Sequence, residues 1–271
     1  MLRKGDLTQG GITGTLLHFT LPMLVGSFLQ QCYNIADTLI VGQCIGAGAL
    51  AAVGSAYTLL VFLISVLLGL AMGSGTVFSL HYGAGNHVAL RRSIFSSFAL
   101  IGIVTLILNV VVFIWLDPIL RLLQAPQDIY GMMRSYLWII FCGIVFTFIY
   151  NFYASLLRAV GDSVTPLWFL AVSVVLNIAL DLFFILQLDW GIQGAAAATV
   201  LAQGVAALGI IIYTYRRRPE LRWHHEDMCF DRTCLKEIAS FSTLTCVQQS
   251  VMNLGILMVQ GLVNSFGTAV M

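Results

Sequence analysis

Two acidic residues, Asp37 and Asp181, lie inside long apolar stretches of the sequence, where a charge is costly. Asn177 precedes Asp181 by four residues in VVLNIALDLFFI, so on a helix the two side chains share one face. Thr199, in AAAATVLAQ, offers a hydroxyl oxygen among alanines that permit close helix approach. Such oxygens suit a hard cation, and carboxyl groups in an apolar environment also take up protons. We interpret Asp37, Asn177, Asp181 and Thr199 as a cation-binding site for sodium or a proton.

The composition is that of a membrane protein. Hydrophobic residues make up 59% of the 271 residues, charged residues make up 9%, and the mean hydropathy is +0.93. A soluble domain carries about 25% charged residues, so this chain has too little polar surface to face water. We predict an all-α polytopic membrane protein. The expected spans are 15–43, 50–80, 92–116, 130–157, 163–187, 191–215 and 238–264.

The basic residues lie between the apolar runs and indicate the orientation. With a cytoplasmic N-terminus, only Arg121 and Arg134 fall outside. The residues on the inside are Arg3, Lys4, Arg91, Arg92, Arg158, Arg216, Arg217, Arg218, Arg222, Arg232 and Lys236. We therefore predict a multi-pass protein of the cytoplasmic membrane, with lipid as a partner and no nucleic acid.

A weak internal repeat predicts two lobes. Gln30–Gln31 and Gln248–Gln249 occur in similar contexts in the first and last spans, and parallel repeats of about six spans recur in transporters. We predict a first six-span lobe at 1–216, a cytoplasmic linker at 217–237 and the start of a second lobe at 238–271. The chain would then be truncated, and the missing second lobe of the same polypeptide would be a partner.

The linker is interpreted as a solvated segment. Four of its residues are potential zinc ligands, but their spacing matches no standard zinc pattern. They are His224, His225, Cys229 and Cys234. We therefore expect no metal in the protein beyond a possible sodium ion at the cation site.

Other polar residues occur within the predicted spans. Tyr136 and Asn151 are candidates for a substrate cavity or for support of the site, although each could equally make an interhelical hydrogen bond. Asn109 is interpreted as a structural hydrogen-bonding residue.

Three residues suggest special helix geometry. Pro22 removes a backbone hydrogen bond in the first span and predicts a kink, at which the helix carrying Asp37 could bend. Gly69 and Gly73 are four residues apart and predict a close packing face.

No motif for catalysis or nucleotide binding occurs. The sequence has no Gly-rich loop that ends in Lys-Ser or Lys-Thr, and no HExxH or GxSxG. We therefore expect neither an enzyme nor a cofactor.

Three segments resemble the multidrug and toxic compound extrusion (MATE) family of secondary antiporters. They are LPMLVGSFLQQCYNIADTLIVGQ, RAVGDSVTPLWFL and VVLNIALDLFFI followed by WGIQGAAAATVLAQ, and the similarity covers essentially the whole chain. It implies twelve spans in two six-helix lobes that open alternately to each side, of which five spans are absent here. It also implies export of cationic, lipophilic compounds in exchange for sodium or protons.

The resemblance also implies site residues. In one branch of the family, the residues that hold the ion match Asp37, Asn177, Asp181 and Thr199. Polar residues of the same cavity match Tyr136 and Asn151, and the kink-forming proline matches Pro22.

Two other functions remain open. A lipid-linked oligosaccharide flippase of the same superfamily would share the lobes, but such proteins usually need cationic residues in the cavity for pyrophosphate. Here Lys and Arg occur in the predicted spans only at or near the span ends, as Arg134 and Arg158 do. A non-transporting membrane protein would tolerate replacement of Asp37 and Asp181 by asparagine. A membrane enzyme is the least favoured class, because no nucleophile–base pair is present.

Overall fold

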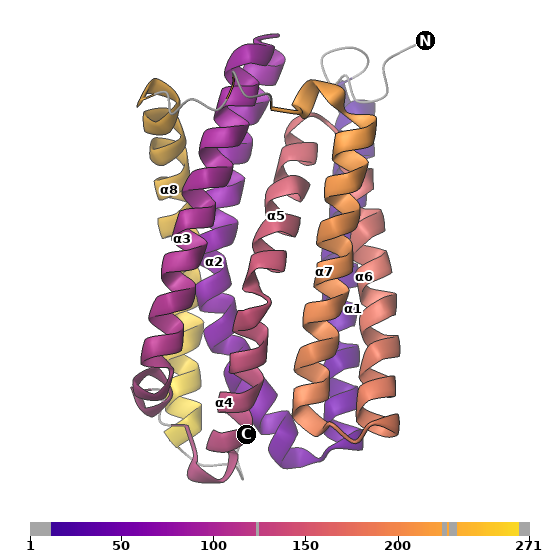
Figure 1. Ribbon diagram of the computed structural model, residues 1–271, viewed down its shortest axis with the longest axis vertical. Helices are drawn as coiled ribbons and strands as arrows, with labels where there is room; N and C mark the ends of the chain where they lie inside the picture. The colour runs from indigo at the N-terminus through magenta and orange to yellow at the C-terminus, as the bar shows by residue number, and fades with distance from the viewer. Residues whose placement is uncertain (1–11, 123–124, 224–226, 228–231, 266–271) are drawn as a thin grey trace.

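The chain folds as a bundle of long helices that run side by side (Figure 1). The computed structural model describes residues 12–122, 125–223, 227 and 232–265. Their α-helices are α1 (Ile12–Cys44), α2 (Ala47–Gly83), α3 (His87–Leu122), α4 (Gln127–Cys142), α5 (Ile144–Ala159), α6 (Val164–Leu182), α7 (Gly191–Arg217) and α8 (Arg232–Ser265). A π-helix, η1 (Phe183–Gln187), extends α6, and a 3-10 helix, η2 (Pro219–Leu221), follows α7. No strand occurs among the described residues, and the all-α prediction is confirmed.

The predicted spans agree with the helices except at the fourth span. Four segments are long and apolar enough to cross a membrane, namely α2, α3, α6 with η1, and α7. The predicted span 130–157 is instead two helices, α4 and α5, which bend by 50° and together form a fifth candidate. α1 and α8 have 33 and 34 residues but are interrupted by polar side chains. Their crossing of the membrane stays a prediction.

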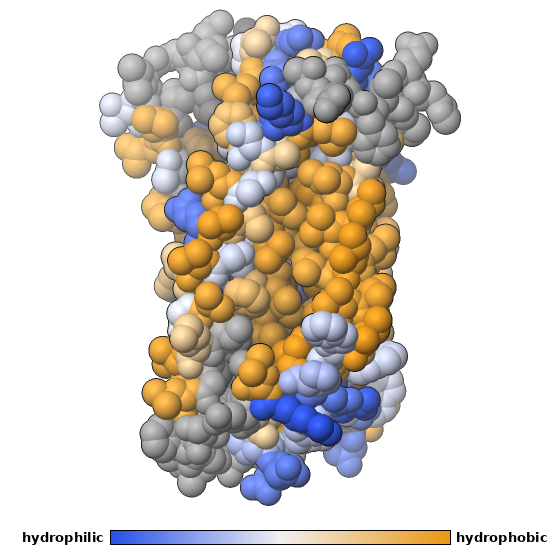
Figure 2. Space-filling view, turned by 90° about the vertical axis from the view of Figure 1, so that its left-hand side faces the viewer, coloured by the Kyte–Doolittle hydropathy of each residue, from blue (hydrophilic) through white to orange (hydrophobic). Residues whose placement is uncertain are grey.

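The surface shown in Figure 2 has an apolar middle and hydrophilic ends, as a protein that crosses a membrane requires. Figure 2 shows a face on which hydrophobic side chains cover most of the middle, while hydrophilic side chains gather at the two ends. Large apolar side chains such as Leu106, Ile114 and Trp168 are more than half exposed, at 58%, 67% and 68%. Exposure of this extent on a soluble monomer would be unusual, and it fits contact with lipid.

The bend between α4 and α5 lies at Gly143, and neighbouring residues explain it. The side-chain amide of Asn109 in α3 donates a hydrogen bond to the Phe141 carbonyl at 2.8 Å, so this carbonyl is bound at the point where the helix breaks. A Cβ atom at Gly143 would lie 2.5 Å from the Val200 side chain of α7. Glycine therefore lets α7 pass close to the bend. The structural role predicted for Asn109 is confirmed.

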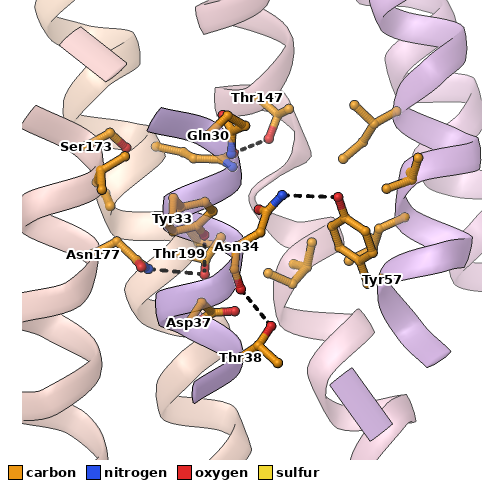
Figure 3. Close-up of a pocket in the computed structure, with 18 of the residues that line it drawn as sticks. Gln30, Tyr33, Asn34, Asp37, Thr38, Tyr57, Thr147, Ser173, Asn177 and Thr199 are labelled. Atoms are coloured by element: carbon orange, nitrogen blue, oxygen red, sulfur yellow. Dashed lines mark hydrogen bonds between the residues drawn. The ribbon is translucent and has the colours of Figure 1, made fainter. Parts of the chain in front are cut away.

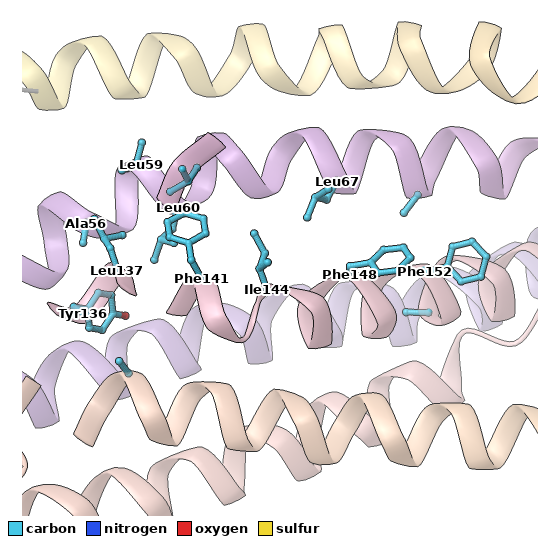
Figure 4. Packing of buried hydrophobic residues seen from close by; sticks show 14 of the residues in the cluster. Ala56, Leu59, Leu60, Leu67, Tyr136, Leu137, Phe141, Ile144, Phe148 and Phe152 are labelled. Atoms are coloured by element: carbon cyan, nitrogen blue, oxygen red, sulfur yellow. The ribbon is translucent and has the colours of Figure 1, made fainter. Parts of the chain in front are cut away.

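The centre of the bundle is filled by apolar side chains of α2, α4 and α5 (Figure 4). Leu60, Phe141 and Phe152 are among the buried members. The rings of Phe98 and Phe152 meet edge to face, with centroids 5.3 Å apart, an arrangement that adds to simple burial. This core holds the bent helix pair against α2 and so positions one wall of the site.

Three described residues after α7 pack against the bundle, namely Leu221, Trp223 and Asp227. Leu221 is 3% exposed, and the Trp223 ring lies 5.5 Å from the ring of Phe98. Arg91 of α3 forms an ion pair with Asp227, with 2.8 Å between Nε and Oδ2. The prediction of a solvated segment is therefore wrong for these residues, because they bury apolar surface and pair a charge. The division into lobes and linker stays a prediction.

The backbones of α2 and α8 lie very close together. A Cβ atom at Gly69 would lie 2.4 Å from Cys246 Cα, and one at Gly73 would lie 2.3 Å from Ser242 Cα. The Ser242 hydroxyl donates a hydrogen bond to the Leu70 carbonyl at 3.2 Å. Small residues are what such an approach between membrane helices requires. The packing face predicted at Gly69 and Gly73 is confirmed.

We expect Gly73→Ala to destabilise the protein, because even a methyl group would overlap the α8 backbone. Overpacking typically costs about 1–3 kcal/mol, so thermal unfolding of the purified protein in detergent should begin several degrees lower. Gly54→Ala is the matched control, since it lies in the same helix with no atom within 4 Å of the added Cβ. The control should keep or slightly raise the midpoint through helix propensity. Equal midpoints for the two variants would contradict the close contact.

Candidate functional site

A cavity of about 850 Å³ opens among α1, α2, α4, α5, α6 and α7, and Asn253 of α8 also reaches it. Its wall combines apolar side chains with tyrosines and with amide and hydroxyl groups (Figure 3). None of its described lining residues is Lys or Arg. The volume and mixed lining are typical of a small-molecule site.

The two acidic residues meet at one side of this cavity. Asp37 of α1 lines the wall, whereas Asp181 of α6 lies behind it and is 0% exposed. The two carboxyl groups interact with each other. Among the described residues, neither Asp37 Oδ1 nor Asp181 Oδ1 has a hydrogen-bond partner, although both atoms are buried. A buried carboxylate without a partner is unfavourable, and that a proton or a cation completes the pair stays a prediction.

Thr199 of α7 joins the helices that carry the acids. Its hydroxyl lies 3.3 Å from the amide nitrogen of Asn177 and 3.4 Å from the hydroxyl of Tyr33 in α1 (Figure 3). The structure thus brings one residue from each of α1, α6 and α7 into a single hydrogen-bonded group beside the acids.

The amide of Asn177 makes more bonds when its oxygen and nitrogen are exchanged. Its nitrogen then donates to Asp181 Oδ2 at 2.9 Å, and its oxygen accepts from the Thr199 backbone and hydroxyl at 3.2 and 3.3 Å. The choice between amide orientations rests on such hydrogen-bond networks. The exchanged orientation gives partners to both the nitrogen and the oxygen of Asn177. The four residues predicted as a cation site therefore lie together, and their role in binding an ion stays a prediction.

The two predicted cavity residues also lie where the sequence placed them. Tyr136 and Asn151 both line the cavity. The Asn151 amide donates to the carbonyl of Thr147 at 2.8 Å, one turn earlier in α5. The Thr147 hydroxyl in turn donates to the side chain of Gln203 in α7. A second polar group thus faces the cavity beside the acids.

Three of these contributors were missed in the sequence, although helical spacing points to each. Tyr33, Thr147 and Gln203 each lie four residues from a predicted site residue, namely Asp37, Asn151 and Thr199. Residues four apart on a helix share a face. Each predicted residue therefore indicated a neighbour on the same cavity wall.

Two remaining predictions concern Pro22 and metals. Pro22 lies inside α1, fifteen residues before Asp37, which is about 22 Å along the helix. The kink stays a prediction. The described residues hold no cluster of three or more metal-binding side chains. Of the four potential zinc ligands, His224, His225 and Cys229 lie outside the described residues.

Comparisons with known proteins agree with this architecture. The MatE family description matches residues 22–183. The probable multidrug resistance protein YpnP of Bacillus subtilis (strain 168) is 32% identical over 273 residues, which span 98% of this chain and 59% of YpnP. The multidrug export protein MepA of Staphylococcus saprophyticus is 31% identical over 210 residues, 74% of this chain and 45% of MepA. The chain thus spans about half the length of these curated relatives.

A solved structure shows the same fold. It is the outward-facing conformation of a multidrug resistance MATE family transporter, with a TM-score of 0.87 and 24% identity. The match covers 94% of this chain and 57% of that one. Proteins of this family are transporters, in line with the expectation that the chain is not an enzyme. The match at residues 22–183, together with the apolar helices, shows that the chain is a multi-pass membrane protein of the MatE family.

Proposed function

We propose that the chain is part of a cation-coupled antiporter that exports organic compounds across the cytoplasmic membrane. The supporting observation is the buried pair of Asp37 and Asp181, each with an unpartnered oxygen, beside a cavity whose described lining holds no Lys or Arg. Sodium or a proton would complete this pair. The names of YpnP and MepA describe multidrug resistance and export proteins, which favours efflux as the direction.

The cavity lining favours cationic or lipophilic substrates. Tyr33, Tyr57, Tyr136 and Tyr150 provide aromatic faces, which attract organic cations. The amide and hydroxyl groups of the lining can hydrogen-bond a substrate and so orient it, and they carry no charge themselves. The described lining offers no cationic partner for pyrophosphate, so it gives no support to a lipid-linked oligosaccharide flippase.

Coupling would act through the helices that the site joins. A cation or proton at Asp37 and Asp181 changes the charge between α1 and α6, and Thr199 links both to α7. A cation drives transport only if it binds the two states of the lobe with different free energies. A unit charge that moves down the membrane potential supplies about 2.3 kcal/mol per 100 mV.

The complete transporter would include a second lobe of the same polypeptide, and membrane lipid would contact the apolar surface. The helix order places Arg91, Arg158 and Arg217 at one end of the bundle and Arg121 at the other. This distribution supports a cytoplasmic N-terminus.

Efflux of a fluorescent organic cation tests the function. Cells that express the complete gene are loaded with the dye, and sodium and proton gradients are imposed separately. We expect efflux to exceed that of cells with an empty vector and to require one of the two gradients, which identifies the ion. Efflux equal to the vector control under both gradients would contradict the proposal.

A further inference from the structure

Arg158 lies on the face of α5 that lines the cavity, beyond the point where the cavity ends. Thr147 and Asn151 line the cavity, and Arg158 follows them by eleven and seven residues. At about 100° per residue, the three side chains fall within about 40° of one another around the helix. Asn151 is the last described lining residue of α5, so Arg158 lies about 10 Å further along the same face.

The side chain of Arg158 is directed back toward the cavity. Helical side chains tilt toward the N-terminus of their own helix, and in α5 this is the direction of Asn151. Arg158 is partly buried, and its charge interacts with Tyr150, a lining residue eight positions earlier. The guanidinium group therefore acts electrostatically on the cavity, although it does not line it.

The positive charge of Arg158 is not balanced by an acidic partner. Among the residues that the structure describes, Arg158 forms neither an ion pair nor a hydrogen bond. Asp162, four residues later, is already bound, because its Oδ2 lies 3.3 Å from Arg218 NH2 and accepts a hydrogen bond from the Thr165 hydroxyl at 2.9 Å. The charge on Arg158 is thus free to act on an ion in the cavity.

The neighbouring helices carry no charged residue nearer to this end of the cavity. On α6, the first charged residue beyond the lining is Asp162, eight positions away, and it is paired. On α7, the first is Arg216, ten positions away and exposed. Arg158, at seven positions, is therefore the uncompensated charge closest to the cavity on α5, α6 and α7, at the end of the bundle proposed as cytoplasmic.

We propose that Arg158 is an electrostatic barrier that keeps the coupling cation from passing from the cavity into the cytoplasm without exchange for substrate. The inference rests on the proposed cation-coupled export and adds the residue that prevents uncoupled entry. A fixed positive charge raises the free energy of a cation on its path, as an arginine can in other membrane proteins. At about 10 Å and an effective dielectric constant of about 20, removal of the charge should speed cation passage by about tenfold.

A purely structural role makes a different prediction. Arg158 lies in the last turn of α5, where a basic residue is favourable beside the helix dipole, and basic residues at the cytoplasmic end also set the orientation of the chain. Both roles would be served by a basic residue on any face of this turn. Neither role predicts that loss of the charge changes the passage of cations.

Uptake of the coupling cation into proteoliposomes without substrate tests the barrier. The complete protein is reconstituted, and entry of sodium or protons under an imposed membrane potential is followed with an ion-sensitive dye trapped inside. We expect Arg158→Gln to raise entry by about tenfold over wild type, and Arg158→Lys, which keeps the charge, to leave it low. Arg217→Gln is the matched control, because Arg217 is exposed at the same end of the bundle and should leave entry unchanged.

Chloride entry into the same vesicles distinguishes a barrier from damage to the fold. A positive charge opposes cations but not anions, so Arg158→Gln should not raise chloride entry, whereas loosened packing would raise the entry of both ions. Equal cation entry in Arg158→Gln and wild type, or a parallel rise of chloride entry, would overturn the proposal. Because this assay needs no substrate, absence of dye efflux in the wild type would count against the export function alone.

Discussion

Asp37→Asn and Asp181→Asn are each expected to abolish gradient-driven efflux while the protein remains folded in the membrane. Asparagine keeps the shape of the side chain but carries no negative charge and releases no proton. Loss of one charged hydrogen-bonding group costs about 1.5–3 kcal/mol, which corresponds to a drop of about 10–150-fold in cation affinity. Dye efflux under an imposed gradient, normalised to the amount of protein in the membrane, measures the effect.

The thermal midpoint of each variant distinguishes a functional role of Asp37 and Asp181 from a structural one. Because Asp37 and Asp181 each have a buried oxygen without a partner, replacing either removes an unfavourable group and should leave the thermal midpoint unchanged or raised. Asp128→Asn is the control, since Asp128 is exposed in the first turn of α4. Full efflux in both site variants would reduce the acids to structural groups. A fall of the midpoint that matches the loss of efflux would lead to the same conclusion.

Hydropathy predicted most of the fold because a chain segment in lipid must hydrogen-bond its own backbone groups. A long apolar run therefore forms a helix. It could not predict the break at Gly143, since nothing in FCGIVFTF distinguishes this glycine from one inside a straight helix. The break depends on contacts with residues distant in sequence, Asn109 at the freed carbonyl and Val200 against the glycine. Tertiary contacts of this kind leave no periodic signal.

The candidate site was predictable for a different reason. A carboxylate in an apolar run is rare enough to be informative by itself, and Asp37 and Asp181 do meet in the structure. The sequence did not show that Asp181 lies behind the cavity wall rather than on it. Nor did it show that Tyr33 shares Thr199 with Asn177. Helical spacing places residues on a face, but the face that meets the cavity depends on the rotation of each helix.

Gly143→Ala is expected to cause the second large loss of efflux, although Gly143 makes no polar contact with the site. Its φ of −93° and ψ of −2° are accessible to alanine, so the backbone conformation is not the obstacle. The added Cβ would lie 2.5 Å from Val200 and would push α7 away. Thr199 directly precedes Val200 in α7, and its hydrogen bonds to Tyr33 and Asn177 are already 3.4 and 3.3 Å long. A shift of a few tenths of an ångström therefore weakens the network beside the acids.

A second substitution shows whether the overlap with Val200 is the cause. Val200→Ala removes the two methyl groups nearest to the new Cβ, so the double variant should recover much of the efflux and of the thermal midpoint lost by Gly143→Ala. Coupling energies between contacting residues are about 0.5–3 kcal/mol, and overpacking alone costs about 1–3 kcal/mol. Gly131→Ala serves as the control, because it lies in α4 with no atom within 4 Å of the added Cβ. If the double variant were as impaired as Gly143→Ala, the bend itself would have to require glycine, and α7 would not be the element that transmits the damage.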